Sequence, residues 1–569
     1  MTSPLDRLFE ALKDRYTIQQ PQVRNGSDRA TAAFTAAVAR NHRSRRGARV
    51  RTQRIAARVA LAGLAFVGLV VLAACEAAPV ETTPDFLTAL TITPDPSGHA
   101  PLTAEATLTT SRPVQVELIV VGRDSTEEWR HDLGTVSGQA RLPILGLYPS
   151  RTNTVTLRFS DPGGAFLADV SRSVATPAPL RDLPAVTIDA ATPAAMTPGM
   201  NLVSYFGHDG QFLPQRPFIF DAEGRIRWYL DFNGHPTLAS LFYDNGVQRL
   251  ANGNLYFGDG STGRIIELDM LGRIVRTWAL SGYGFHHQVL ELPSGNFLVT
   301  VNQAGAPTVE DRLIELDRQS GAVAREWDLT QSLDATRRAW PTDLADLNVD
   351  WFHANGVAYD PRDGGIIVSG RTQGTVKLTP DNAVVWILAP HRGWGTAGDG
   401  TDLTTRLLQP LDAAGQPITD PAVLDGTANH PDFEWAWYQH CPLLLDDGTL
   451  LLFDNGDNRN YTGQQRYSRA VAYRIDETAM TVRQLWQYGA ERGAETYSRI
   501  VSAVDYHAAE DNLVLMPGAA GSGAGAYGKV VEIDYSTRAV VFEATITPPT
   551  APFGITFHRV KRLSLYPPD

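Results

Sequence analysis

The sequence predicts an all-β protein in which a small Ig-like β-sandwich precedes a six-bladed β-propeller. One kind of hairpin turn recurs six times along the chain, and a second kind recurs upstream of five of these turns. The chain has 569 residues, including 49 Gly and 36 Pro, and is 43% hydrophobic and 20% charged. This composition is typical of a large globular protein rich in turns, and it argues against a disordered chain or a coiled coil.

The first repeated turn follows a short apolar run and usually carries an Asp, and an aromatic residue stands 7 to 10 positions after the turn begins. The turns begin at Asp221, Asp269, Asp317, Thr379 (in Thr379-Pro380-Asp381), Asp476 and Asp534. The aromatic residues are Trp228, Trp278, Trp327, Trp386, Trp486 and Phe542. Apolar runs on both sides of a turn predict a β-hairpin at each of the six sites.

The second repeated turn lies upstream of five of these hairpins. It occurs at Asn252-Gly253, Ser294-Gly295, Asp363-Gly364, Asp447-Gly448 and Glu510-Asp511. Two hairpins per unit make four strands, so six units spaced by roughly 50 to 60 residues predict a propeller over residues 184–569. One longer spacing indicates an insertion around residues 391–433. The alternative, a stack of β-sandwiches, does not predict one repeated order of hairpins.

Residues 87–183 are predicted to form the N-terminal sandwich. Six or seven short alternating runs, such as residues 102–109, 114–121 and 154–159, are bounded by turn residues. Short strands at this spacing are typical of an Ig-like sandwich. Residues 76–86, which are rich in Pro and in small and acidic residues, are predicted to be a tether.

Residues 1–75 are predicted to be a basic arm followed by a lipoprotein-type signal segment. Residues 59–74 carry no charge and end in Leu72-Ala73-Ala74-Cys75. That length favours a signal peptide over a membrane span of roughly 20 residues, although a single transmembrane anchor is the alternative. We expect an exported protein, anchored in the membrane by a lipid on Cys75 and facing the periplasm or the cell exterior. The residues ahead of the segment indicate either a natural start near Val50 or a true basic arm.

The net charge of −12 is divided unequally along the chain. Residues 1–58 contain 13 Lys and Arg and four acidic residues, a net charge of +9, so the remainder carries −21. An acidic body argues against nucleic acid as a partner, because phosphate binding needs clustered Lys and Arg. The glycine-rich run at 523–528 leads into a predicted strand rather than the helix that phosphate binding requires, so we expect no nucleotide or other cofactor.

Three histidines share one position in the repeat. His287 and His440 each lie eight residues before the Gly of the second turn, and His353 lies eleven residues before Gly364, in a longer turn. The first strand of a blade lines the central channel of a propeller, so we expect the three imidazoles to converge there.

Strand geometry extends this set, because side chains alternate between the two faces of a strand. Alternation selects His287 over His286, places Asn355 and Trp351 beside His353, and turns Cys441 away from the channel. The strand after the turn returns toward the same end of the blade. Seven positions beyond each aligned Gly it carries Asn302, Arg371 and Asn455.

This set of side chains favours an anion over a cation. It offers imidazoles, amides and a guanidinium, and no carboxylate stands at the aligned positions. The planar fork of Arg suits a tetrahedral oxyanion, and a neutral imidazole can act as a nucleophile toward sulfur or phosphorus. The sequence therefore predicts a pocket that binds and transfers an anionic group, without a metal.

The sequence resembles the bacterial arylsulfate sulfotransferases over most of residues 85–569. The motifs that carry the resemblance are Gly146-Leu147-Tyr148-Pro149, Phe285-His286-His287-Gln288, Asp350-Trp351-Phe352-His353-Ala354-Asn355-Gly356, Ser369-Gly370-Arg371, Tyr438-Gln439-His440-Cys441-Pro442 and Phe453-Asp454-Asn455-Gly456-Asp457-Asn458-Arg459. The resemblance implies a six-bladed propeller that moves a sulfuryl group from a phenolic sulfate ester to an acceptor phenol, without the nucleotide donor PAPS.

The resemblance also implies roles for particular residues. His440 matches the covalent nucleophile of a ping-pong reaction that passes through a sulfohistidine. His353, Asn355, Arg371 and one of His286 and His287 match the sulfate-binding residues, and we select His287. Together with the repeat, this gives two sets of residues. The catalytic set is His440, His353, Arg371 and His287, and the substrate-binding set is Asn355, His286, Asn455 and Trp351. Some relatives are soluble periplasmic proteins with a disulfide, whereas this chain has only Cys75 and Cys441.

Two other functions are compatible with the same residues. The histidines could bind iron or zinc in a metal-dependent propeller enzyme, although Arg371 in the same ring would repel a cation. The chain could instead be a non-catalytic surface module that binds an anionic aryl ligand. The partners expected for the transferase are an aryl sulfate donor, a phenolic acceptor and the membrane, and a homodimer is compatible with all three functions.

Overall fold

The structure is a computed structural model that describes residues 84–205, 215–242, 246–338, 341–521, 525–548 and 557–567. The expectations for residues 1–83, including the basic arm, the signal segment and lipidation of Cys75, lie outside the described residues. Within the described ranges, no helix is both long and apolar enough to cross a membrane. The prediction of an all-β protein is confirmed.

The first domain contains five antiparallel strands, which are β1 (Leu87–Pro94), β2 (Ala104–Val121), β3 (Glu128–Ile144), β4 (Thr152–Ser160) and β5 (Phe166–Ala175), with a short turn η1 (Ser125–Glu127). The long strands β2 and β3 pair along their whole length, whereas β1 pairs with the first part of β2 and β4 with its second part. Phe86, at the end of the predicted tether, is buried in the core of this domain, so the domain begins before residue 87.

The remaining strands form six further sheets within the described residues. Three have four consecutive strands. They are β10 (Gln248–Arg249), β11 (Leu255–Asp259), β12 (Arg264–Leu268) and β13 (Ile274–Ala279); β14 (Tyr283–Glu291), β15 (Phe297–Gln303), β16 (Arg312–Leu316) and β17 (Val323–Asp328); and β18 (Ala354–Asp360), β19 (Gly365–Gly370), β20 (Gly374–Leu378) and β21 (Val384–Leu388).

The other three sheets recruit a strand from elsewhere in the chain. They are β23 (His440–Leu444), β24 (Thr449–Asp454), β25 (Arg469–Asp476) and β26 (Thr481–Tyr488) with β22 (Gln409–Pro410); β27 (Ala503–His507), β28 (Asn512–Met516), β29 (Gly528–Asp534) and β30 (Val540–Thr547) with β6 (Ala185–Ala191); and β7 (Met200–Tyr205), β8 (Phe218–Phe220) and β9 (Ile226–Tyr229) with β31 (Phe557–Leu563). The short helices are α3 (Leu329–Ser332), η2 (Leu403–Arg406), α4 (Pro421–Leu424), η3 (Arg459–Tyr461) and η4 (Ala490–Glu495).

Both kinds of predicted hairpin are present in these sheets. The turns that begin at Asp221, Asp269, Asp317, Thr379, Asp476 and Asp534 join the last two consecutive strands of each sheet, as in β12–β13. The Gly-containing turns and Glu510-Asp511 join the first two, as in β14–β15. The predicted insertion at 391–433 contributes η2, α4 and β22, which pairs in parallel with β26.

The repeated tryptophans explain why the hairpin repeats. Each indole N–H donates a hydrogen bond to the Asp-type turn of the next sheet. The pairs are Trp228 to Met270 O (2.8 Å), Trp278 to Arg318 O (2.9 Å), Trp327 to Thr379 O (3.0 Å), Trp386 to Glu477 Oε1 (3.0 Å) and Trp486 to Tyr535 O (2.9 Å). At the sixth position Phe542 has no N–H and packs in an apolar cluster with Ala222 and Ile226. The aromatic residue therefore joins each sheet to its neighbour.

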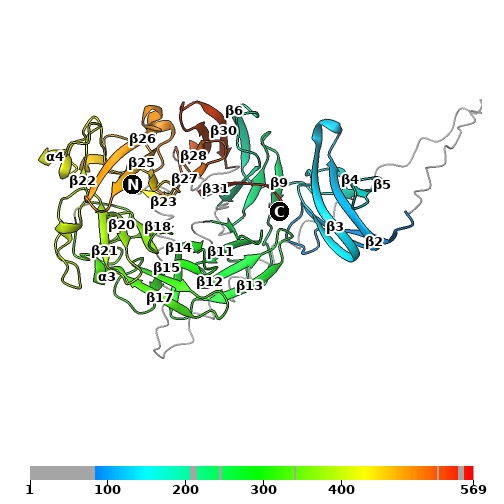
Figure 1. The fold of residues 1–569 in the computed structure, drawn as a ribbon, viewed down its shortest axis with the longest axis horizontal. Helices are drawn as coiled ribbons and strands as arrows, with labels where there is room; N and C mark the ends of the chain where they lie inside the picture. Colours follow the sequence, from blue (N-terminus) through cyan, green and yellow to red (C-terminus); the bar gives the residue numbers. More distant parts are fainter. Residues whose placement is uncertain are drawn as a thin grey trace, which may run out of the picture. The chain divides into compact units, whose positions relative to one another are not determined.

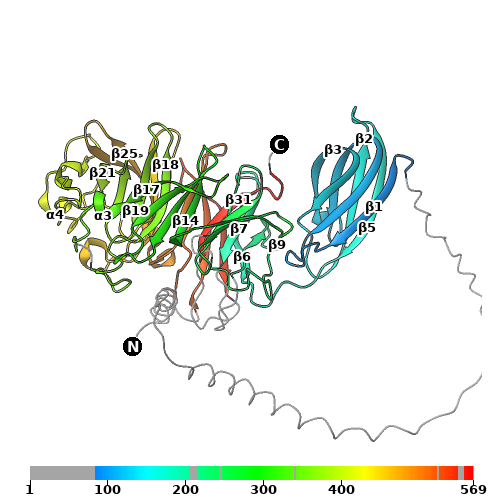
Figure 2. The same cartoon turned by 90° about the horizontal axis from the view of Figure 1, so that it is seen from below.

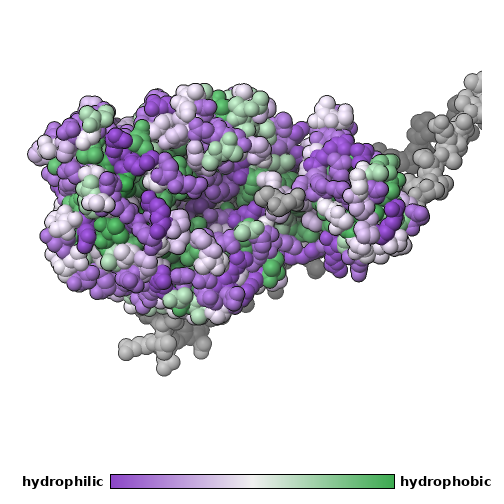
Figure 3. All heavy atoms as spheres, viewed as in Figure 1, coloured by the Kyte–Doolittle hydropathy of each residue, from purple (hydrophilic) through white to green (hydrophobic). Residues whose placement is uncertain are grey.

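Inner strands of the six sheets lie around a common centre (Figure 1). Strands β11, β14, β18, β23, β27 and β31 pack against one another in chain order. Val247 N–H donates to Ser204 Oγ at 2.9 Å, which links the sheet of β10 to the sheet of β7. Strand β31 pairs with β7 (Figure 2), so the C-terminal part of the chain completes the sheet begun near residue 200. Hydrophilic side chains gather around the middle of this face (Figure 3).

Candidate active site

The three aligned histidines meet where inner strands of three neighbouring sheets converge. His287 lies in β14, His353 directly precedes β18 and His440 begins β23, and their exposed fractions are only 6%, 5% and 3%. The Nε2 atoms of His287 and His353 are 3.0 Å apart, and the ring centroids of His287 and His440 are 6.3 Å apart. The structure therefore brings together the imidazoles that the repeat aligned.

The backbone is strained at or next to the aligned histidine in each of these three sheets. His287, His353 and Cys441 have positive φ values of 54°, 57° and 53°, and the strand register shifts at each site. A non-glycine residue in this conformation costs roughly 1–3 kcal/mol and persists only where the surroundings impose it. Such strain within one residue of the same register in three sheets is typical of a functional site.

The shift in β14 corrects the choice between His286 and His287. Strict alternation would turn one ring away, but the bulge allows both rings into the cluster, with centroids 3.9 Å apart. His287 contacts His353, as expected, while Nε2 of His286 lies 2.8 Å from Oε2 of Glu310. The expectation that only one of the two could face the centre was wrong.

Two glycines allow the strands to approach closely. A Cβ on Gly356 would lie 3.0 Å from the backbone nitrogen of Cys441, so a side chain here would push β18 away from β23. A Cβ on Gly370 would lie 2.5 Å from the ring of Phe352. Both glycines stand within predicted motifs and keep His353 and Arg371 close to His440.

His440 is held in a single tautomer. Nδ1 of His440 lies 2.8 Å from Asn455 Oδ1 and 3.0 Å from the carbonyl oxygen of Tyr438. The amide nitrogen of Asn455 donates to the carbonyls of Ser498 and Val501, which fixes its oxygen as the acceptor toward His440. Nδ1 therefore carries the proton, and Nε2 of a neutral His440 has a free lone pair.

Burial keeps His440 neutral. Desolvation, followed by the neighbouring His287 and His558, holds the pKa of His440 well below its usual value, and these effects outweigh the hydrogen bond to Asn455. The imidazole that the sequence selected as nucleophile is thus an unprotonated base at neutral pH.

His353 has the opposite environment, because two carboxylates from outside the aligned positions contact its ring. Its Nδ1 contacts Glu310 Oε2 and lies 2.9 Å from Asp350 Oδ2. Burial and Arg371 oppose a charge on this ring, but Asp350 and Glu310 outweigh them and raise the pKa of His353 to about 9. The same ion pairs with His286 and His353 hold the pKa of Glu310 well below its usual value, despite its burial.

Arg371 lies in the same cluster, as predicted. It is buried, its backbone N–H donates to His353 O at 3.1 Å, and its Nη2 lies 3.4 Å from Asp350 Oδ2. Asp350 thus stands between Arg371 and His353 and moderates the repulsion between the two cations. The structure gathers residues 287, 353, 371 and 440 in one site.

Of three other predicted residues, two lie beside the predicted nucleophile and one lies elsewhere. Asn355 donates to the carbonyl of Gln439 at 2.8 Å, and Asn455 orients His440, so both position the peptide and ring of the predicted nucleophile. Trp351 lies in an apolar core, where its indole donates to Asp311 at 2.8 Å. The structure does not bring Trp351 to the histidines.

Residues 186–552 match the family described as Arylsulfotransferase (ASST), and residues 91–177 match the Arylsulfotransferase Ig-like domain. This chain belongs to the arylsulfotransferase family. It is 30% identical to the arylsulfate sulfotransferase AssT of Lelliottia amnigena over 79% of this chain and 89% of the relative. Identity and coverage are the same for AssT of Escherichia coli O6:H1 strain CFT073. Aryl sulfotransferase activity is the function that these relationships support.

Structural comparison adds little to this assignment. A structural genomics protein of unknown function from Bacteroides thetaiotaomicron aligns over 82% of this chain and 98% of its own length. Its sequence is 9% identical and its TM-score is 0.30, which is too low for an argument about the arylsulfotransferase fold.

Four side chains of this arylsulfotransferase are close enough together to hold a metal ion. They are His286, His287, Glu310 and His353, whose ligand atoms lie within 4.8 Å of one another. Hydrogen bonds account for the same arrangement, because His353 contacts Glu310 through Nδ1 and His287 through Nε2. A metal ion bound to one ring nitrogen of His353 would replace only the contact that this nitrogen makes, and the contact of the other nitrogen would remain.

Three residues of the site were missed by the sequence analysis. Asp350 stands inside a motif that was recognised, three residues before His353, so the signal was present. Glu310 lies in a turn outside the aligned positions. His558 lies in β31, with its ring 5.4 Å from that of His287, but this strand comes from the end of the chain and has no following Gly turn to align.

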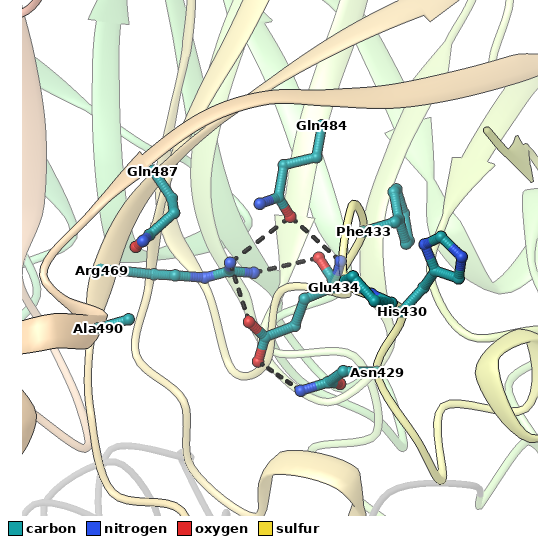
Figure 4. A pocket seen from close by; sticks show the side chains of 9 residues that line it. Asn429, His430, Phe433, Glu434, Arg469, Gln484, Gln487 and Ala490 are labelled. Atoms are coloured by element: carbon teal, nitrogen blue, oxygen red, sulfur yellow. Dashed lines mark hydrogen bonds and ion pairs between the residues drawn. The ribbon is translucent and has the colours of Figure 1, made fainter. Parts of the chain in front are cut away.

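A separate pocket of about 270 Å³ lies beside β25 and β26 of the arylsulfotransferase (Figure 4). Glu434 and Arg469 line it, and Arg469 Nη1 is 2.9 Å from Glu434 Oε2 while its Nε donates to Asp454 at 2.8 Å. The cation at this pocket is paired with two carboxylates, so we assign the cluster a structural role.

Proposed function

We propose that the protein transfers a sulfuryl group from an aryl sulfate to an acceptor phenol by a ping-pong reaction in which His440 is the nucleophile. The observation that carries this proposal is the fixed tautomer of His440, with its proton on Nδ1 toward Asn455 and its lone pair on Nε2. A buried imidazole that stays neutral is suited to attack sulfur.

In the first half-reaction, Nε2 of His440 bonds to sulfur as the bond between sulfur and the aryl oxygen breaks, and the aryl oxygen keeps the electron pair. Arg371 and the imidazoles of His287 and His353 stabilise charge on the sulfuryl oxygens, and fixed donors of this kind are worth about 10²-fold to 10³-fold each in rate. In the second half-reaction, the oxygen of the acceptor phenol bonds to sulfur, the bond between sulfur and Nε2 of His440 breaks, and a neighbouring imidazole takes the phenolic proton. A phenolate is a good leaving group, so the reaction needs no PAPS.

We further propose that the six sheets close into a six-bladed propeller around this site. The chain order of the inner strands and the aromatic junctions between sheets support closure. The uncharged segment that ends at Cys75 supports an exported enzyme held at the membrane by a lipid. Retention of radiolabelled lipid by the wild type and its loss from Cys75→Ala would test the anchor.

The transfer is tested by incubation of the purified protein with 4-nitrophenyl sulfate. We expect release of nitrophenol that depends on added phenol, and without acceptor a stable increase by the mass of one SO₃ group on the peptide that contains His440. The matched control is His430→Ala, which removes a partly exposed histidine outside the cluster and leaves both results unchanged. Release without a modified peptide, or release unaffected in His440→Ala, would overturn the proposed nucleophile.

A further inference from the structure

Glu310 is built into the site by its backbone as well as by its side chain. It has a positive φ of 60°, its N–H donates to Asn302 Oδ1 at 2.6 Å, and its carbonyl accepts from Ala354 N at 2.8 Å. The side chain is only 13% exposed. A strained residue that is clamped from both sides and buries a carboxylate is expected to serve a function.

The carboxylate of Glu310 connects two histidines. Oε2 lies 2.8 Å from His286 Nε2 and contacts Nδ1 of His353, which also faces Asp350. Because ionised carboxylates only accept hydrogen bonds, Nδ1 of His353 is a donor. The other ring nitrogen, Nε2, lies 3.0 Å from Nε2 of His287 and thus points toward the aligned imidazoles.

Five groups face His353 from the surrounding elements. Two carry negative charge: Glu310, from the turn between β15 and β16, and Asp350, ahead of β18. Arg371, after β19, carries positive charge, and His286 and His287 of β14 complete the set. Asp350 is shared with Arg371, whereas the contacts of Glu310 are to histidines. Glu310 is therefore the carboxylate that serves His353 without also neutralising the guanidinium.

We infer that Glu310 is a positioning residue that keeps His353 protonated, so that His353 gives a proton to the departing phenolate and recovers one from the acceptor phenol. This inference rests on the proposed sulfuryl transfer. In this reaction His440 bonds to sulfur, and His353 donates and accepts the phenolic proton.

The atoms balance across the two half-reactions. As His440 Nε2 bonds to sulfur, the bond between sulfur and the aryl oxygen breaks, and that oxygen takes both the electron pair and the Nε2 proton of His353. In the second half-reaction, the oxygen of the second phenol bonds to sulfur and the bond between sulfur and Nε2 of His440 breaks. Neutral His353 accepts the proton of this phenol. Both histidines return to their starting states.

The acidity of His353 suits this role. Its pKa is raised to about 9, and an unperturbed phenol has a pKa of about 10, so the proton moves between groups of similar strength. An imidazole without the carboxylates would be neutral at pH 8 and could not donate this proton.

The first experiment compares leaving groups. In Glu310→Gln, the first half-reaction with phenyl sulfate is expected to slow by about 10²-fold, and with 4-nitrophenyl sulfate, whose phenol is more acidic, by no more than about tenfold. The matched control is Asp311→Asn, which alters the adjacent buried carboxylate that binds Trp351 and leaves both rates within about twofold of the wild type. Equal losses with both esters would mean that Glu310 only supports the fold, and would overturn the inference.

The second experiment titrates the wild type, so it does not depend on turnover or on the folding of Glu310→Gln. Imidazole nitrogen NMR of the histidine-labelled wild type, with the His353 signals assigned by their absence in His353→Gln, is expected to show a cationic ring at pH 7.5 that titrates near pH 9. A neutral His353 at pH 7.5 would overturn the inference even if sulfuryl transfer is active. A cationic His353 in a protein that forms no sulfohistidine would overturn the proposed function, and with it the catalytic use of that proton.

Discussion

His440 and His353 occupy equivalent positions in neighbouring sheets, are both buried, and both use Nδ1 to contact a side-chain oxygen. They differ in the partner. His440 faces the amide of Asn455, whereas His353 faces the carboxylates of Glu310 and Asp350. The neutral partner leaves the first ring uncharged, and the charged partners keep a proton on the second. The charge of each imidazole is therefore set by the group that contacts its Nδ1 atom.

Removal of the neutral imidazole is expected to have the largest effect. His440→Ala eliminates the only bond that the enzyme forms to sulfur in the proposed reaction, so kcat/KM should fall on the order of 10⁴-fold or more. Steady-state release of nitrophenol measures this loss. A residual rate within about tenfold of the wild type would mean that another group attacks sulfur.

Exchange of the partner should convert the first histidine toward the second. Asn455→Asp places a carboxylate against Nδ1 of His440 and should raise the pKa of that imidazole, with a loss of about 10²-fold in kcat/KM at pH 7 that diminishes as the pH rises. Asn455→Ala should lose about 10-fold to 10²-fold at every pH, because the tautomer is no longer fixed. Identical pH profiles for the two variants would contradict the contrast drawn between the histidines.

The two histidines should also be visible in the pH profile of the wild type. Because His353 must be protonated and its pKa is about 9, kcat/KM for phenyl sulfate should decline as the pH rises through about 9. Because the pKa of His440 is held well below 6.5, the acidic decline in kcat/KM should lie below that pH. Rates from pH 5 to 10 test both limbs.

The proton on His353 also contributes to the stability of the fold. This contribution is fully present below about pH 6.5 and is lost as the pH rises through about 9.

A buried ion cluster outside the site provides a contrast in stability rather than activity. Glu434 contacts Arg459 Nη1 at 2.5 Å and Arg469 Nη1 at 2.9 Å. Glu434→Gln should lower the free energy of unfolding by about 3–5 kcal/mol, because it removes one of the two carboxylates, Glu434 and Asp454, that pair with these buried cations. Urea denaturation measures this change, and kcat/KM at 25 °C should remain that of the wild type. A loss of activity without a loss of stability would connect this pocket to catalysis.

Removal of metal ions is expected to have the smallest effect. Dialysis against EDTA should leave kcat/KM unchanged, because protons already account for the contacts among His286, His353 and Glu310. Metal analysis before and after dialysis is the control. A stoichiometric metal whose removal abolishes activity would favour the metal-dependent alternative.

The repeat made much of the site predictable. Counting from each Gly turn placed His287, His353 and His440 at one register, and Arg371 on the returning strand, because the pairing of a hairpin fixes distance along the chain. This is also why the hairpins themselves could be recognised from a single sequence.

What the sequence did not reveal depends on departures from that regularity. The bulge in β14 brings in His286, the turn ahead of β16 supplies Glu310, and β31 returns from the end of the chain with His558. Alternation along the strand predicts that Trp351 lies on the same face as His353, but Trp351 lies in an apolar core, where its indole donates to Asp311. Bulges, the paths of turns and the pairing of strands that are distant in sequence depend on packing between sheets. The residue pattern within one strand carries no information about that packing.

His558 reaches the cluster of imidazoles on β31, a strand from the C-terminal part of the chain. β31 closes a sheet whose other strands lie more than 300 residues earlier in the sequence, and it contributes an imidazole next to His287. A nascent or truncated polypeptide without this strand would expose the unpaired edge of β7 and leave the cluster of imidazoles short by one. The enzyme is therefore built so that it gains its complete set of histidines only when the final strand has been added.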